Sequence, residues 1–135
     1  MRYLLDTHAW LWALLGHVRL GAAARRVLAG IGEDEPIGLA AISLKEAAWL
    51  LARGRVLIKR DPSAWADWLR DAAAAPGLDV LPFTVEAAIE SERLPDDFPS
   101  DPADRLIAAT ARLHDLTLLT ADRVMRARSE LRTLW

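Results

Sequence analysis

The stretch Tyr3-Leu4-Leu5-Asp6 decides the fold class, because it sets a carboxylate directly after a short apolar run. Three consecutive apolar residues are typical of a strand that is buried on both faces of a sheet. The segment His8–Leu15 follows at once and is apolar nearly all round, which predicts a buried helix that stops at Gly16. The sequence therefore opens with a strand, one acidic residue and a helix.

The rest of the chain repeats this alternation of short apolar runs and helical patterns. Strands alternating with helices predict an α/β fold with three layers, α/β/α, around a central parallel sheet of about four or five strands. The length of 135 residues suits a single domain spanning residues 1–135. Further strands are expected at Ile37–Ile42, Asp79–Pro82, Thr117–Leu119 and Leu131–Trp135. Helices are expected at Gly21–Ile31, Ser43–Ala52, Pro62–Ala75, Thr84–Arg93 and Pro102–His114, with a last short helix capped by Thr120.

The composition excludes several classes of protein. The chain has no cysteine, so no disulfide, thiolate metal site or cysteine nucleophile exists, and a reducing cytoplasm fits. The longest uncharged stretch, Thr7–Val18, is shorter than the roughly 18–20 apolar residues of a membrane span, so no membrane segment is expected. The 17 basic and 19 acidic residues give a net charge of −2, which does not predict a general nucleic-acid coat.

Four acidic residues occupy comparable places in this alternation. Asp6 and Asp122 each follow a strand closely, Glu46 opens the helix after the second strand, and Asp104 lies in the first turn of a helix. Open parallel sheets bind ligands at the carboxyl ends of their strands, so these acids are expected to converge at one edge. Each acid alone is also explained as a helix cap; Glu46, for example, completes a Ser43-x-x-Glu46 capping box.

The four acids together point to a metal ion. Four carboxylates at one edge repel one another unless a cation neutralises them, and oxygen ligands favour Mg²⁺ or Mn²⁺. A pair of such ions supports in-line hydrolysis of a phosphodiester bond. A receiver domain would need paired acids and a later lysine, yet Lys59 is the last lysine; a haloacid-type phosphatase would need a second acid after Asp6-Thr7.

Four motifs in order along almost the whole chain carry a resemblance to a known family. The motifs are Leu4–Ala9, Ile42–Glu46, Asp101–Ala111 and Leu118–Asp122. With them the chain resembles the PIN-domain ribonucleases, and most closely the VapC-type toxins of bacterial toxin–antitoxin pairs. The resemblance implies a PIN-like parallel sheet, an acidic pocket that binds Mg²⁺ or Mn²⁺, and endonucleolytic cleavage of RNA.

The resemblance also implies roles for individual residues. By position, Asp6, Glu46, Asp104 and Asp122 match the family's catalytic and metal-binding acids. Thr120 matches a hydroxyl beside the last acid, expected to orient that carboxylate or a water. Thr7 and Asp101 are expected either to support the acids as Thr120 does or to act only as helix caps, and the sequence leaves open whether Asp101 touches the metal.

The implied biological role is that of the toxin in a type II pair. Its expected partners are the RNA substrate, a cognate antitoxin protein and a second copy in a homodimer, in the cytoplasm. The alternative is a PIN-like RNA-binding or scaffold module without activity. The sequence carries no readable code for the RNA that is cut, for the antitoxin, or for one metal against two.

Two further residues near these motifs each allow more than one interpretation. His8 follows Asp6-Thr7 and either reaches the pocket or packs against the next helix. Arg105 adjoins Asp104 and either balances acidic charge, holds a phosphate or forms a structural ion pair, and the ion pair is the expectation here.

Overall fold

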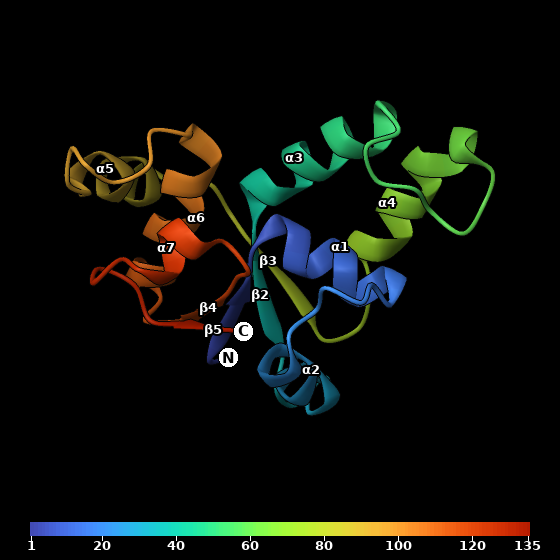
Figure 1. Ribbon diagram of the computed structural model, residues 1–135, viewed down its shortest axis with the longest axis horizontal. Coiled ribbons are helices and arrows are strands. Elements are labelled where there is room, and N and C mark those ends of the chain that lie inside the picture. The colour runs from blue at the N-terminus through green and yellow to red at the C-terminus, as the bar shows by residue number, and fades with distance from the viewer.

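The computed structural model describes residues 1–135 as strands that alternate with helices, as the sequence predicts (Figure 1). No helix combines the length and the apolar character that crossing a membrane requires. The strands are β1 (Tyr3–Leu5), β2 (Ile37–Ala40), β3 (Leu78–Leu81), β4 (Thr117–Leu119) and β5 (Thr133–Leu134). The helices are α1 (Thr7–Leu15), α2 (Ala22–Ala29), α3 (Ala41–Ala52), a short 3-10 helix (Pro62–Ala64) leading into α4 (Trp65–Ala73), α5 (Val85–Arg93), α6 (Pro102–Leu113) and α7 (Arg123–Arg126).

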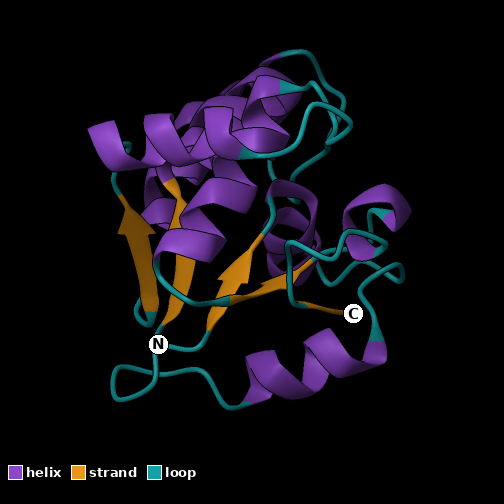
Figure 2. Cartoon of the chain, turned by 90° about the vertical axis from the view of Figure 1, so that its left-hand side faces the viewer, coloured by secondary structure: helices purple, strands orange, loops and turns teal.

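All five strands run parallel in one twisted sheet, in the order β3-β2-β1-β4-β5 (Figure 2). The chain first adds strands on one side of β1 and later adds β4 and β5 on the other side. The strand order therefore reverses between β1 and β4, which is where open α/β sheets form their ligand crevice. In register, Leu5 lies beside Leu39 of β2 and Leu119 of β4, so these three strands end together.

Two hydrophobic cores cover the two faces of the sheet, as the three-layer expectation requires. Consecutive strand residues point to opposite faces. Leu5 therefore packs with α1, α2 and the inner sides of α3 and α4 in one cluster, while Leu4 packs with α6, α7 and the segment after α5 in the other. Figure 1 shows α5, α6 and α7 on one side of the sheet and α1, α2 and α4 on the other.

Two predicted element boundaries are wrong near the second strand. The strand expected over Ile37–Ile42 ends at Ala40, and α3 begins at Ala41 instead of Ser43. An apolar run does not separate a buried strand from the buried first turn of a helix, because both read alike. The predicted Ser43 capping box is also wrong, since Ala40 is the N-cap residue and supplies no side-chain hydrogen bond.

Acidic and hydroxyl side chains cap four other helices. Asp6 caps α1, Thr84 caps α5 and Asp101 caps α6, each by accepting hydrogen bonds from free backbone amides of the first turn. The last helix is capped by Asp122, and the prediction that Thr120 caps it is wrong. The chain therefore uses three of its aspartates to fix the places where helices leave the carboxyl edge of the sheet.

Candidate active site

A cleft of about 460 Å³ opens beside the carboxyl ends of β1 and β4 and contains all four predicted acids. Each acid comes from a different segment: Asp6 follows β1, Glu46 lies on α3, Asp104 lies on α6, and Asp122 follows β4. The strand register explains the convergence, because neighbouring parallel strands end at the same edge. The other lining residues are Thr7, His8, Trp12, Arg19, Ile107 and Ala121.

Asp6 is held through both of its carboxylate oxygens. The backbone amide of Ala9 donates to Oδ1 over 2.8 Å, and the hydroxyl of Thr120 donates to Oδ2. Thr120 in turn accepts a hydrogen bond of 3.1 Å from the backbone amide of Asp122. Thr120 thus contacts the side chain of the first acid and only the backbone of the last one, so it fixes the orientation of the Asp6 carboxylate.

Glu46 is bound by a residue that lies far from it in the sequence. The hydroxyl of Thr7 donates to Oε1 of Glu46 over 2.6 Å, and Oγ of Ser43 lies 3.0 Å from the same Thr7 hydroxyl. Thr7 and Ser43 are both buried, so the three side chains form a chain of polar contacts between α1 and α3. The carboxylate of Glu46 therefore contacts α1, and it does not cap the backbone amides at the start of its own helix, α3.

The remaining two acids differ in how firmly they are held. Asp122 accepts hydrogen bonds of 2.9 and 3.1 Å from the amides of Val124 and Met125 through a single oxygen, Oδ1. Asp104 makes no side-chain hydrogen bond. Asp101 is exposed and does not line the cleft. Its Oδ1 accepts hydrogen bonds from the backbone amides of Ala103 and Asp104. Asp101 therefore sets the backbone of the turn that carries Asp104.

Burial and mutual repulsion disturb the ionisation of the acids. Burial, followed by the charges of Asp101, Asp122, Glu46 and Asp6, raises the pKa of Asp104 to about 7. Burial also raises the pKa of Asp6, although the hydrogen bonds from Thr120 and Ala9 act in the opposite direction. No basic side chain offsets the repulsion between these carboxylates, since none of the four cleft acids forms an ion pair.

The donor set of the cleft fits a hard divalent cation. All four acidic groups are carboxylates, which are the ligands that Mg²⁺ and Mn²⁺ prefer, and no cysteine or paired histidine competes. In the arrangement seen here, no three of the acidic or histidine side chains lie close enough to hold one ion, so a bound cation would require these side chains to move closer together. A cation among them would relieve the repulsion that raises the pKa of Asp104.

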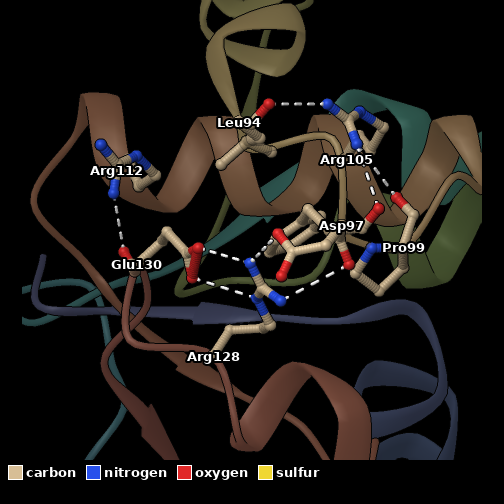
Figure 3. Close-up of polar contacts among 8 residues, drawn as sticks. Leu94, Asp97, Pro99, Arg105, Arg112, Arg128 and Glu130 are labelled. Atoms are coloured by element: carbon tan, nitrogen blue, oxygen red, sulfur yellow. Dashed lines mark hydrogen bonds and ion pairs between the residues drawn. The ribbon is translucent and has the colours of Figure 1, made fainter.

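Arg105 contacts four backbone carbonyls, and the predicted ion pair is wrong. Its guanidinium donates to the carbonyls of Leu94 and Pro99 over 3.1 and 3.4 Å (Figure 3). It also donates to the carbonyls of Ser91 and Phe98 over 3.1 and 3.3 Å. These contacts tie the segment between α5 and α6 to the first turn of α6. Arginine suits this role because its planar fork offers five donors in fixed directions.

A second arginine, which the sequence patterns do not single out, fixes the other side of the same segment. Arg128 forms ion pairs of 2.9 Å with Asp97 and 2.6 Å with Glu130 (Figure 3). Its guanidinium lies 5.3 Å from the centre of the Phe98 ring. The Arg105 guanidinium lies 5.8 Å from that ring. Both arginines therefore pack on Phe98, a core residue of the segment that leads to Asp101 and Asp104.

Comparison with known proteins agrees with this geometry. A family model described as the PIN domain matches residues 3–131. Ribonuclease VapC22 of Mycobacterium tuberculosis is 35% identical over 134 residues, which cover 98% of this chain and 97% of that protein.

Solved structures give the same fold at lower identity. The chain of VapBC2 from Rickettsia felis, solved with a promoter DNA fragment, superposes with a TM-score of 0.74 at 17% identity and covers 99% of this chain and 98% of its own. DNA-bound VapBC from Salmonella typhimurium gives a TM-score of 0.71 at 18% identity, and the match covers 99% of this chain and 97% of that chain. VapC20 of Mycobacterium tuberculosis, a toxin that cleaves the sarcin–ricin loop, gives a TM-score of 0.66 at 18% identity. The match covers 96% of this chain and 98% of that chain.

Proposed function

Because the chain belongs to the PIN-domain family, we propose that its acidic cleft hydrolyses phosphodiester bonds of RNA and that the protein is the toxin of a type II toxin–antitoxin pair. One observation carries the proposal: four carboxylates from four segments line one cleft without any ion pair. The relative that is 35% identical is named a ribonuclease, which supports RNA as the substrate.

The proposed cofactor is Mg²⁺ or Mn²⁺, and Asp6, Glu46, Asp104 and Asp122 would hold it. A bound ion of this kind would supply the activation of water and the neutralisation of charge on the leaving oxygen. Carboxylate oxygens and the absence of softer ligands support a hard cation over zinc.

The chain's own residues prepare the cleft for this chemistry. Thr120 and the amide of Ala9 fix both oxygens of Asp6, and Thr7 fixes Glu46, so two acids keep their orientation before substrate arrives. Asp122 keeps Oδ2 free of protein hydrogen bonds, and Asp104 keeps both oxygens free. Burial and the neighbouring carboxylates raise the pKa of Asp104 to about 7, so the charge of this acid is sensitive to a cation that enters the cleft.

The proposed partners follow from the same family. We propose a cognate antitoxin protein, because the neighbouring structures include VapBC complexes, and a homodimer. The absence of cysteine suits a cytoplasmic location for such a pair. Residues 1–135 would act as one PIN domain.

The decisive experiment is cleavage of total cellular RNA by the purified protein with Mn²⁺ or Mg²⁺. EDTA and the Asp6→Asn variant are the controls. The proposal predicts discrete fragments that vanish in both controls. Absence of cleavage together with a melting temperature that Mn²⁺ does not change would overturn the enzymatic function and favour an inactive binding module.

A further inference from the structure

One wall of the acidic cleft is built from aromatic and basic side chains that the catalytic role of the acids leaves unused. This wall consists of His8, Trp12 and Arg19, which line the same cleft as the four acids. His8 and Arg19 are exposed, and Trp12 is half-buried. The His8 ring lies 5.6 Å from the Trp12 ring, and the Arg19 guanidinium lies 6.0 Å from it.

Arg19 carries a positive charge that no protein carboxylate neutralises. It is the single arginine or lysine that lines the cleft, yet it forms no ion pair with any of the four acids there. Its backbone amide donates to Nδ1 of His17 over 3.1 Å, while no hydrogen bond occupies its guanidinium. The guanidinium is therefore available to an anion from solvent, and its fork matches the oxygens of a phosphate.

The segment that carries Arg19 is fixed by neighbouring contacts. The ring of His17 stacks on Trp12 with a centroid distance of 5.3 Å and an interplanar angle of 21°. Arg25 donates to the carbonyls of His17 and Leu20 over 3.0 Å each. The backbone that carries Arg19 is therefore fixed beside the cleft before any ligand binds, so binding has to order only the side chain.

We propose that this wall is the subsite for the nucleotide next to the scissile bond, in a single-stranded RNA. Arg19 binds the phosphate of that nucleotide, and the exposed ring of His8, backed by Trp12, stacks on its base. The proposal rests on the ribonuclease function proposed above. Nucleobases stack on aromatic side chains in many single-strand binding proteins, and a nearby arginine offsets the repulsion between RNA and an acidic cleft.

The test compares Arg19→Gln with Arg26→Gln. Arg26 is an exposed arginine on α2 that lines a different hollow and forms no ion pair, so it matches the charge change. Cleavage of a random-sequence single-stranded RNA of about 20 nucleotides is followed with Mn²⁺ at several salt concentrations. Arg19→Gln should raise KM about tenfold with little change in kcat, and lower the salt slope of kcat/KM by about 0.7. Arg26→Gln should leave KM and the salt slope of kcat/KM unchanged.

His8 is tested by two substitutions. His8→Ala should raise KM about tenfold, and His8→Phe should restore most of the loss, because a ring suffices for stacking. If the Arg19→Gln variant kept the KM and the salt slope of the wild-type protein, the proposed contact between Arg19 and the phosphate would be overturned. Equal KM values for His8→Ala and the wild-type protein would overturn the stacking.

Binding of the same labelled RNA, measured by fluorescence anisotropy with Mn²⁺, separates this proposal from the enzymatic one. If the wild-type protein does not cut the RNA but binds it in an Arg19-dependent way, the nuclease function fails and the subsite stands. Arg19-independent binding, or no binding at all, overturns the subsite whether or not cleavage occurs.

Discussion

Thr7 and Glu46 are joined by a hydrogen bond of 2.6 Å, in which the first residue of α1 donates to a carboxylate on α3. The contact joins α1 and α3, the helices that follow the neighbouring strands β1 and β2. Thr7 is buried, so its hydroxyl has few other partners, and the carboxylate of Glu46 is held at the edge of the cleft.

Replacing Thr7 should therefore impair activity more than folding. Thr7→Val keeps the shape and removes the donor, and we expect the Mn²⁺-dependent cleavage rate to fall about 10- to 100-fold, as for other residues that orient ligands. Thr110→Val is the matched control, because Thr110 is also buried but donates to the carbonyl of Leu106 within α6. Equal losses of activity in the two variants would contradict the role of Thr7.

Asp104 should destabilise the metal-free protein and stabilise the metal-bound one. Its raised pKa means that the charged form is disfavoured in the folded state, so at pH 8 the neutral Asp104→Asn variant should be more stable without metal. We expect a gain of about 1 kcal/mol once solvent screening is allowed for.

The same variant should lose most of the rise in melting temperature that Mn²⁺ gives the wild-type protein. Asp79→Asn, an exposed aspartate on β3 that does not line the cleft, is the control in both measurements. An undiminished Mn²⁺ shift in Asp104→Asn would remove Asp104 from the proposed ligands.

Arg105 should be important for stability because its guanidinium contacts four carbonyls at once. Arg105→Gln leaves several of these groups without partners, and we expect a loss of about 3 kcal/mol in the free energy of unfolding, measured by urea denaturation. Arg70→Gln removes only an exposed pair with Asp67 and should cost less than about 1 kcal/mol. A loss in Arg105→Gln as small as that in Arg70→Gln would contradict the tie between α5 and α6.

The ion pairs of Arg128 should make stability depend on pH in the acidic range. The hydrogen bonds from Arg128 hold the pKa values of Asp97 and Glu130 below their usual range. Carboxyls with depressed pKa values stabilise the fold above their unfolded values of about 4, and this stabilisation is lost as the pH falls through the folded values. Melting temperatures of the wild-type protein and Arg128→Gln should therefore differ at pH 7 and converge toward pH 3. A gap that stays constant would show that packing on Phe98, and not charge, accounts for the difference.

Much of the fold could be predicted from short stretches of sequence. The apolar run Tyr3–Leu5, the helix start at Pro102 and the strand Thr117–Leu119 are local signals, and the structure confirms each of them. The boundary at Ala41 was predicted wrongly, because an apolar run serves equally well in a buried strand and a buried helical turn.

The sequence by itself determined that acidic residues lie near the places where strands end and helices begin at one edge of a parallel sheet, because local patterns indicate those places. The expectation that Glu46 opens its helix is wrong, since α3 begins at Ala41 and Glu46 lies in its second turn. Only the tertiary structure decided which side chains meet there. The partner of Glu46 lies 39 residues away at Thr7, and the cleft beside Asp104 includes Arg19. Such contacts depend on strand order and on how helices cross the sheet, so no local pattern distinguishes an arginine that binds carbonyls, such as Arg105, from one left free beside a cleft.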